Sequence, residues 1–362
     1  MSRRIFCTVL LVAVAIFGLL FFSGILSAQG RSDGAFERVK EVQERHTNDL
    51  IAMDGVEGTA IGFNENDRLA VKVFTARPGV GGIPKSLDGV PVQVVVSGKF
   101  YALPMPDTPP GLEQKEDEVD PTIRFDRPVP IGVSTGNEGE CSAGTIGCRV
   151  TDGTDVYALS NNHVYALENV ALVGSNVLQP GRYDTYCETN EDDVIGTLFD
   201  FEPIVFYDTE NPPDPIPTNE IDAAIAEIII DETTGPRVDK ATPDDGYGTP
   251  SSTIFGGDLL DLEVQKYGRT TGLTKGTITE VNFIGNIGYS SGTARFVGQI
   301  VIIAPKGRFS RRGDSGSLIV TDDEYRNPVG LLFAGGGRWT IANPIDAVLE
   351  AFEVTIDDDA AE

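Results

Sequence analysis

Three short motifs contain the side chains of this chain that are best suited to nucleophilic chemistry. His163 ends the stretch SNNH, Asp222 precedes a long apolar run, and Ser315 lies in GDSG. A serine hydroxyl becomes a nucleophile when an imidazole takes its proton, and a carboxylate orients that imidazole and stabilises its charged form. His, Asp, Ser is one of the chain orders in which such a triad occurs. We therefore predict that His163 is the general base, that Asp222 orients it and that Ser315 is the nucleophile.

The glycines around Ser315 favour a tight turn that exposes the hydroxyl group. Such a turn also directs backbone N–H groups toward one point, where they stabilise a negatively charged oxygen. We expect the N–H groups of Gly313 and Ser315 to form this oxyanion hole. The structural alternative is a glycine-rich hairpin that leads into the strand-like run 318–320.

The chain has only two histidines. A histidine at the end of a strand usually has a structural role, but His163 is the only histidine of the β-rich region, which makes it the candidate base. His46 lies among polar residues with helical spacing, so we predict a solvated helix residue. Asp222 precedes the apolar run 223–230. Four other aspartates compete for the orienting role, but none precedes so long a run: Asp192, Asp193, Asp200 and Asp208.

The composition indicates a large and strongly acidic globular protein. The 362 residues are 40% hydrophobic, which is enough for a large core. Lys and Arg number 28 and Asp and Glu 55, so the net charge is −27. Such a surface repels nucleic acid and anionic membranes, and we exclude both as partners.

Residues 1–30 have the composition of an export signal. A basic start is followed by the apolar run 5–22, and small residues follow at Ser27, Ala28 and Gly30. The run approaches the length of a membrane span, so an uncleaved anchor is the alternative. Both predict a secreted, periplasmic or cell-surface protein whose membrane contact is limited to a possible N-terminal anchor.

The cysteines point to one disulfide bond. Cys7 lies in the export segment, which leaves Cys141, Cys148 and Cys187. Export permits a disulfide, but three thiols cannot all pair within one chain. We expect Cys187 to pair with Cys148 or Cys141 and to close the loops around His163.

The chain divides into four parts after the export segment. Residues 34–102 combine helical spacing with short β-type runs, which predicts a small α+β domain. Prolines among Asp and Glu predict an extended, solvated linker over 103–128. Residues 129–355 contain many short strand-like runs with turn signals, typical of a β-sandwich or a pair of barrels. The acidic tail 356–362 is predicted to be disordered.

The motifs SNNHV, DAAIA and GDSGSL, in this order, resemble those of the trypsin/chymotrypsin-like serine peptidases, as found in bacterial secreted members and in the plant narrow-leaf trypsin-like proteins. The resemblance covers residues 129–355. It implies a mainly β fold, a chymotrypsin-like double β-barrel with the active site between two six-stranded barrels, preceded by the small N-terminal α+β domain. GRTTG at 268–272 would lie early in the second barrel.

The resemblance also implies substrate-binding residues and a final helix. The expected pocket floor is near Phe309 and Ser310, and VGLLFAG at 329–335 is similar to the strand that lines the substrate cleft. A helix should close the domain, with Asn343 as N-cap and Pro344 at its first position. The cleft-lining residues are Phe333, Ala334 and Gly335.

Basic residues near the predicted site have two interpretations. They would favour acidic substrates, or they pair with nearby acidic surface, which is the usual case for exposed charges. Phe309 argues against a pocket carboxylate that would select Lys or Arg. The basic residues are Arg308, Arg311, Arg312 and Arg338.

Three features depart from the animal members of this family. Ser317 occupies a position where the digestive enzymes have glycine, and Val164 replaces the cysteine that often follows the catalytic histidine. No Ile-Val-Gly-Gly activation sequence precedes Cys141. Activation by a new N-terminus that pairs with Asp314 is therefore not expected.

The sequence predicts an exported serine endopeptidase that hydrolyses protein or peptide substrates through an acyl-enzyme. No metal or cofactor is required, and the sequence specifies no oligomeric state. The alternatives are a binding or scaffold protein that retained the fold and lost turnover, and an esterase-type hydrolase. A complete triad weighs against the scaffold. The N-terminal domain is inhibitory, folding-assisting or a permanent accessory.

Overall fold

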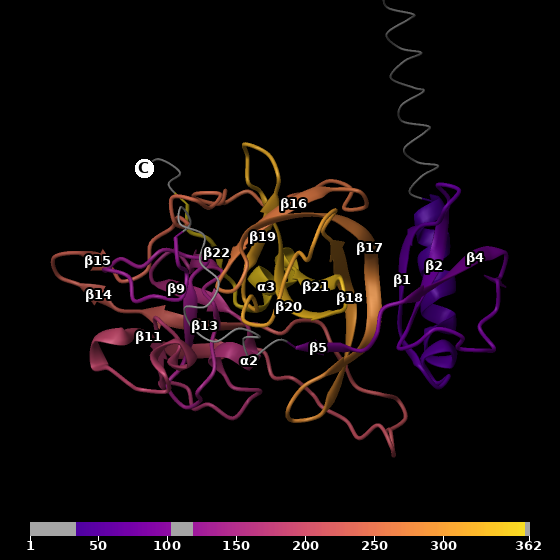
Figure 1. Cartoon of the computed structure of the whole chain (residues 1–362), viewed down its shortest axis with the longest axis horizontal. Coiled ribbons are helices and arrows are strands. Elements are labelled where there is room, and N and C mark those ends of the chain that lie inside the picture. The colour runs from indigo at the N-terminus through magenta and orange to yellow at the C-terminus, as the bar shows by residue number, and fades with distance from the viewer. Residues whose placement is uncertain (1–33, 103–118, 359–362) are drawn as a thin grey trace, which may run out of the picture.

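The computed structural model of the chain describes residues 34–102 and 119–358 (Figure 1). The predicted export signal or anchor, residues 103–118 of the predicted linker and residues 359–362 of the tail lie outside the described residues. No helix of the described ranges has the length and apolar character needed to cross a membrane.

Six antiparallel strands close into a barrel in the C-terminal part of the chain. Their pairing runs from β16 through β17, β18, β21, β20 and β19 and returns to β16. The 17-residue strand β17 alternates between buried and half-exposed residues over most of its length, as expected for a strand with one face on a core. The strands are β16 (Glu263–Gly268), β17 (Gly272–Gly288), β18 (Thr293–Ile303), β19 (Leu318–Thr321), β20 (Pro328–Gly336) and β21 (Trp339–Pro344).

The other curled sheet, the first barrel, consists of strands that precede this second barrel in the sequence and of the last strand, β22. Its order is β22-β8-β9-β13-β11-β10-β6-β7, and all its pairs are antiparallel. The strands are β6 (Ser134–Asn137), β7 (Gly144–Thr145), β8 (Cys148–Thr151), β9 (Val156–Ser160), β10 (Asn176–Leu178), β11 (Val194–Phe201), β13 (Ala224–Ile228) and β22 (Thr355–Ile356).

The two sheets share a core. One cluster of buried side chains joins β8, β9 and β13 of the first sheet to Leu318 of β19, Leu331 of β20 and Val348 of the last helix. A residue that follows a strand of one sheet can therefore face a loop of the other sheet. The prediction of a mainly β, chymotrypsin-like double barrel is confirmed by this arrangement.

Residues 34–102 form a helix and five strands that are continuous with the second barrel. The helix occupies residues 34–51, and its apolar face, which includes Val42 and Leu50, is buried in the same cluster as Ile278 of β17. The strand β1 pairs with β17, β2 pairs with β1, and β4 pairs with β2, so the sheet extends outward (Figure 1). These strands are β1 (Val56–Phe63), β2 (Leu69–Thr75), β3 (Ser86–Leu87), β4 (Val90–Val96) and β5 (Phe100–Ala102).

The strand β5 lies inside the second barrel's sheet. It pairs in parallel with the end of β17, where Tyr101 faces Gly288. It also pairs antiparallel with β20, where Ala102 faces Ala334 and Tyr101 faces Gly335. The domain boundaries predicted from the sequence remain a prediction, but the last residues of the range 34–102 are strand partners of the C-terminal barrel.

The remaining elements are short. They are α2 (Asn162–Tyr165), α3 (Ile345–Ala351), the 3-10 turns η1 (Arg182–Thr185) and η2 (Glu191–Asp193), and the strands β12 (Thr218–Asn219), β14 (Ile230–Asp231) and β15 (Gly235–Pro236).

The start of the C-terminal helix differs from the prediction. Pro344 is the N-cap of α3 and the first helical residue is Ile345, one position later than expected. Asn343 does not cap the helix, because its side chain is hydrogen-bonded to Gln299 and to the backbone of Asp222. The prediction that Asn343 is the N-cap is therefore wrong.

The charged ends of the linker and tail are more ordered than the sequence suggested. Arg124 forms a two-pronged ion pair with the buried carboxylate of Asp193, so the described part of the linker is docked on the first barrel. In the tail, Asp357 pairs with Arg149 at 2.6 Å and with Lys240 at 3.1 Å. The prediction of a disordered tail does not hold for these residues.

Of the two disulfide partners that the sequence allowed for Cys187, the structure has Cys141. Cys141 and Cys187 form a disulfide bond, while Cys148 is a free, buried thiol on β8. Burial raises the pKa of the Cys148 thiol above the usual range, so it stays protonated.

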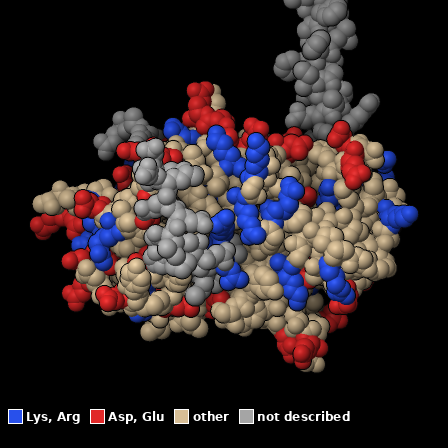
Figure 2. All heavy atoms as spheres, in the orientation of Figure 1, with Lys and Arg blue, Asp and Glu red and all other residues tan. Residues whose placement is uncertain are grey.

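The surface charge is unevenly distributed. On the face shown in Figure 2, Lys and Arg side chains gather over the part of the molecule that contains β16 to β19, and Asp and Glu side chains lie mainly toward the margins. The second barrel therefore presents basic groups on this face although the chain as a whole carries a net charge of −27.

Candidate active site

His163 and Asp222 meet in the interior between the two sheets. Nδ1 of His163 lies 2.6 Å from Oδ2 of Asp222, and the backbone N–H of His163 donates to Oδ1 over 3.2 Å. His163 is 1% exposed and Asp222 is fully buried. A carboxylate with this geometry fixes the imidazole orientation and stabilises the imidazolium form.

Local backbone contacts explain why these two residues meet. The strand β9 ends at Ser160, which pairs with Ala224 at the start of β13, so His163 and Asp222 lie beyond the same edge of paired strands. The Asn161 amide donates to the backbone carbonyl of Asp222 over 2.7 Å, and Asn343 accepts from its backbone N–H over 3.1 Å. Two buried asparagines thus hold the backbone that carries the carboxylate.

The Ser315 turn depends on its glycines. Gly313 and Gly316 have φ angles of 95° and 93°, which only glycine adopts readily. A Cβ atom on Gly316 would lie 2.2 Å from Oγ of Ser160 and 2.3 Å from the carbonyl oxygen of Thr145. The turn is therefore pressed against the strands that precede His163. The carbonyl of Ser315 accepts from the N–H of Thr145 over 2.8 Å.

No hydrogen bond joins Nε2 of His163 to Oγ of Ser315. Nε2 of His163 is buried and has no hydrogen-bond partner. Oγ of Ser315, also buried, donates to the carbonyl of Phe333 over 3.4 Å. Catalytic hydrogen bonds are often loose in unliganded enzymes and tighten when substrate binds. Nε2 of His163 is therefore a buried nitrogen to which no group donates a hydrogen bond.

The hydrogen bonds of two carbonyl groups near Ser315 fix the directions of the N–H groups of Gly313 and Ser315. The carbonyl of Arg312 accepts from Oγ1 of Thr270 over 2.7 Å, and that of Asp314 accepts from Oγ of Ser317 over 2.6 Å. In a planar trans peptide the following N–H points the opposite way. The N–H groups of Gly313 and Ser315 therefore point away from Thr270 and Ser317 respectively.

A buried lysine and several donors hold the Asp314 carboxylate. Oδ1 accepts from the N–H groups of Thr270 and Thr271, and Oδ2 accepts from the N–H of Arg311 over 2.8 Å. Nζ of Lys266 lies 3.8 Å from Oδ2, and both side chains are fully buried. Burial lowers the pKa of Lys266 from 10.5 to about 8, against the opposing effect of Asp314. The Asp314 carboxylate thus has the buried ammonium group of Lys266 as its neighbouring positive charge.

The predicted substrate residues fall into two groups. Phe309 packs in the barrel core with its ring centroid 6.0 Å from Nζ of Lys266, and Ser310 exchanges a hydrogen bond with Thr340. The ring of Phe333 packs against Phe296. Ala334 and Gly335 contribute their backbone edge, which is paired with Ala102 and Tyr101 of β5.

The sequence analysis missed three residues that contact the candidate site. Tyr289 donates to Oδ2 of Asp222 over 2.9 Å, Asn343 holds the Asp222 backbone, and Lys266 faces Asp314. Each is far from its partner along the chain and lies in no recognisable motif. Lys266 had one signal, since it lies in the short strand-like run LEVQKY, and a lysine buried in a strand is expected to need an acidic partner.

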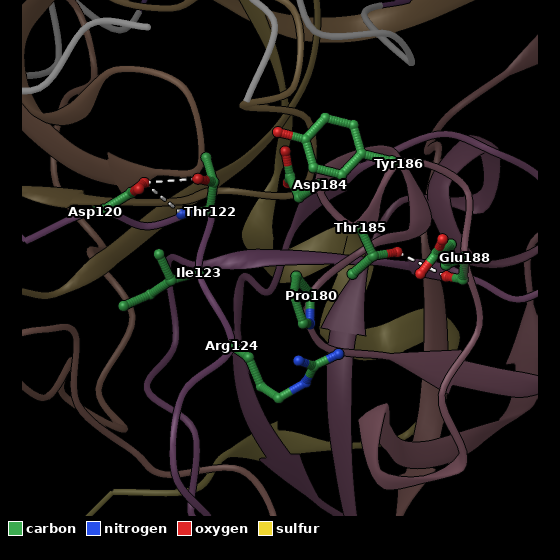
Figure 3. Close-up of a pocket in the computed structure, with 9 residues that line it drawn as sticks. All are labelled: Asp120, Thr122, Ile123, Arg124, Pro180, Asp184, Thr185, Tyr186 and Glu188. Atoms are coloured by element: carbon green, nitrogen blue, oxygen red, sulfur yellow. Dashed lines mark hydrogen bonds between the residues drawn. The ribbon is translucent and has the colours of Figure 1, made fainter. Parts of the chain in front are cut away.

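The structure also has a surface cavity of about 460 Å³ (Figure 3). None of the predicted site residues lines it. Asp184, one of its lining residues, is already paired with Arg269 and with Ser134. The other lining residues are Asp120, Thr122, Ile123, Arg124, Pro180, Thr185, Tyr186 and Glu188. We therefore assign no catalytic role to this cavity.

Solved structures similar to this chain include bacterial serine proteases. A glutamic acid-specific serine protease is 19% identical over 63% of this chain and 100% of its own, with a TM-score of 0.41. Protease A of Thermobifida fusca is 18% identical, with coverages of 63% and 97% and a TM-score of 0.42. The α-lytic protease homolog N4 is 17% identical, with coverages of 63% and 99% and a TM-score of 0.42. No family model and no curated protein matches the chain.

Proposed function

We propose that the chain is an exported serine endopeptidase. The observation that carries this proposal is the buried His163–Asp222 pair, whose imidazole keeps a nitrogen without a hydrogen-bond partner, together with a Ser315 turn that packs against Ser160, three residues before His163. The paired Cys141 and Cys187 support export, because disulfides persist in oxidising compartments. The export signal proposed for residues 1–30 fits the same location.

The proposed reaction is acyl transfer through Ser315. Nε2 of His163 takes the hydroxyl proton while Oγ attacks the peptide carbonyl, and the N–H groups of Gly313 and Ser315 bind the oxyanion. His163 then gives the proton to the leaving amine, and water hydrolyses the acyl-enzyme by the same steps. Asp222 stabilises the imidazolium at each stage. The chain's own residues supply every group in this scheme.

The proposed substrate is an extended peptide. The β20 edge at Ala334 and Gly335 is able to pair with a strand, since it already pairs with β5 in an antiparallel register. Main-chain hydrogen bonds to such an edge give affinity, and side-chain pockets give specificity. We assign Phe309 and Ser310 to the neighbouring pocket and Phe333 to its wall.

A catalytically silent binding protein is the second candidate. The observation that favours it is the missing hydrogen bond between Ser315 and His163. Such a protein has no need of a buried, charge-stabilised imidazole, which costs stability to desolvate. The peptidase is therefore the better supported function, and an esterase activity would use the same residues.

Labelling with a fluorophosphonate probe tests the proposal. A sequence-specific cleavage site is inserted within residues 103–118, and the intact and cut proteins are both exposed to the probe, because β5 occupies the β20 edge in the uncut chain. We expect labelling at Ser315, mapped by mass spectrometry, and its loss in Ser315→Ala and His163→Ala. Peptide hydrolysis should fall by several orders of magnitude in both variants. Peptidase activity that survives Ser315→Ala would refute the assignment.

A further inference from the structure

The turn between β17 and β18 brings a tyrosine from the second barrel to the triad. Tyr289 follows β17 directly, and its N–H donates to the carbonyl of Gly292 over 2.7 Å, which closes the turn. Its hydroxyl donates to Oδ2 of Asp222 over 2.9 Å. Its ring meets the His163 imidazole edge to face, with the centroids 6.1 Å apart. One side chain thus contacts two members of the proposed triad.

The tyrosine ring is fixed by aromatic neighbours. The ring of Phe206 lies edge-on to it at 5.4 Å between centroids, and that of Phe296 is stacked at 6.2 Å. Burial raises the pKa of Tyr289 well above 10, and the negative charge of Asp222 adds to the shift. The hydroxyl therefore stays protonated and donates to Asp222 throughout the pH range in which a histidine titrates.

The turn is also hydrogen-bonded to the segment that carries His163, through Glu168, and we call these contacts the clasp. Oε1 of Glu168 accepts from Oγ of Ser290 over 2.7 Å, and Oε2 accepts from the N–H of Ser291 over 2.7 Å. Glu168 lies three residues after α2, in a run with Leu167 and Asn169 in which all three φ angles are positive. Non-glycine residues adopt this conformation at a cost. The clasp is thus built from strained backbone, as is common at functional sites.

We propose that Tyr289 is a positioning residue of the triad. Its hydroxyl holds the Asp222 carboxylate in the orientation that accepts the Nδ1–H group of His163, and it shares the charge of the oxygen that faces the imidazole. The inference rests on the proposed peptidase function. The proposal gives the β17–β18 turn a role in catalysis, although the turn contains no recognisable sequence motif.

The test compares Tyr289→Phe with Tyr207→Phe. The matched control removes a hydroxyl that donates to Asn286 on the same strand β17 over 2.7 Å instead of to Asp222. We expect Tyr289→Phe to lower kcat by about 10- to 100-fold, because a hydrogen bond to a charged group is lost, with little change in KM. The acid limb of its pH–rate profile should move to higher pH, since Oδ2 then presents its full charge to the imidazole.

A spectroscopic measurement separates this inference from the proposed function. In Ser315→Ala protein, the Nδ1–H proton resonance of His163 should move when Tyr289→Phe is added and should stay when Tyr207→Phe is added. His46→Gln assigns the signal, because the chain has only two histidines. This readout needs no turnover, so an inactive wild type contradicts the peptidase function alone.

A second variant guards against misfolding. Ser290→Ala removes one donor of the clasp and leaves the tyrosine in place, and we expect a smaller loss of kcat in the same direction. If Tyr289→Phe matches Tyr207→Phe in kcat, pH profile and proton resonance, the positioning role is overturned.

Discussion

Lys266 is the residue whose charge state should be visible in the activity of the protein. Its buried ammonium group lies 3.8 Å from the carboxylate of Asp314, which precedes the proposed nucleophile, and among the described residues it is the cation that is ion-paired with that carboxylate. When the ammonium loses its proton, the Asp314 carboxylate remains buried without a counter-charge. The turn that orients Gly313 and Ser315 should then become less well ordered.

We therefore expect a bell-shaped pH–rate profile. The acid limb reports the base, which must be neutral to accept the serine proton. The alkaline limb should lie near pH 8, the lowered pKa of Lys266, and should disappear in Lys266→Met. Rates measured from about pH 5 to 10 in both proteins check this. An alkaline limb that persists in Lys266→Met would assign it to another group.

The effect of Lys266 on stability has the opposite sign. Above a pH of about 8 the folded chain loses this proton, while the unfolded chain keeps it up to 10.5. Within that window the unfolded state binds more protons, so the contribution of Lys266 to the free energy of unfolding rises with pH. Loss of activity between these values is therefore expected without loss of the fold.

The candidate triad could be proposed from residue types, but the side chains that contact its members could not. With two histidines in the chain, few positions can hold an imidazole base, and the order of the three motifs selects His163. Tyr289 and Asn343 act through contacts across 67 and 121 residues of sequence. Their types are common in strands and turns, so nothing in the local sequence distinguishes them from ordinary surface residues.

Among the elements, the disulfide loop has the clearest energetic consequence. Cys141 and Cys187 are separated by 46 residues, and the loop they close contains β8, β9 and α2. The chain-entropy relation gives a stabilisation of about 4 kcal/mol for a loop of this length. The sequence allowed two pairings because spacing alone does not place Cys148 inside a sheet.

We expect the double variant Cys141→Ala, Cys187→Ala to lose about 4 kcal/mol in its free energy of unfolding. Urea unfolding with and without a thiol reductant measures this loss. The reductant should destabilise the wild type and leave the double variant unchanged, since Cys148 has no disulfide partner. Equal sensitivity of the two proteins to the reductant would contradict the assignment.

The short helices were harder to predict than the strands. The many short strand-like runs with turn signals predicted a β-sandwich or a pair of barrels, and the family resemblance implied the double barrel that the structure has. The start of α3 was misplaced by one residue because Asn343, a residue type common at N-caps, is used by Asp222 and Gln299. A tertiary contact here overrode a local preference.

At the scale of the whole molecule, the N-terminal residues have two contacts with opposite consequences. The strand β5 occupies the β20 edge that we assign to the substrate, while β1 and β5 both support β17, which leads to Tyr289. The first contact should block peptide binding, and the second should help to build the triad. The sequence left inhibition, folding assistance and a permanent accessory role open, and these contacts favour the first two together.

We expect that cutting the chain within residues 103–118 raises peptidase activity, and that residues 34–102 added in trans lower it again. The cut removes the covalent link between β5 and the barrel, so β5 should compete less effectively with substrate for the β20 edge and the rate should rise. Initial rates before and after the cut measure it. Activity that is indifferent to both the cut and the added segment would leave the accessory role.

A substitution in β5 gives the same test without a cut. Tyr101→Pro removes a backbone N–H of β5 at the residue that is opposite Gly335, and a proline in a paired strand should weaken the pairing of β5 with its neighbours. Uncut Tyr101→Pro protein should therefore be more active than uncut wild type. Lys99→Ala, just before the strand, is the matched control.

The continuous sheet formed by β17 and β1 has a consequence for how activity responds to dilution. A cut leaves residues 34–102 attached through strand pairing and the helix packed on the barrel. Release is then a bimolecular equilibrium, so the active fraction should depend on total protein concentration and grow as the cut protein is diluted. Cut protein at high concentration would therefore stay largely inactive, and the same molecules would become active when they are diluted.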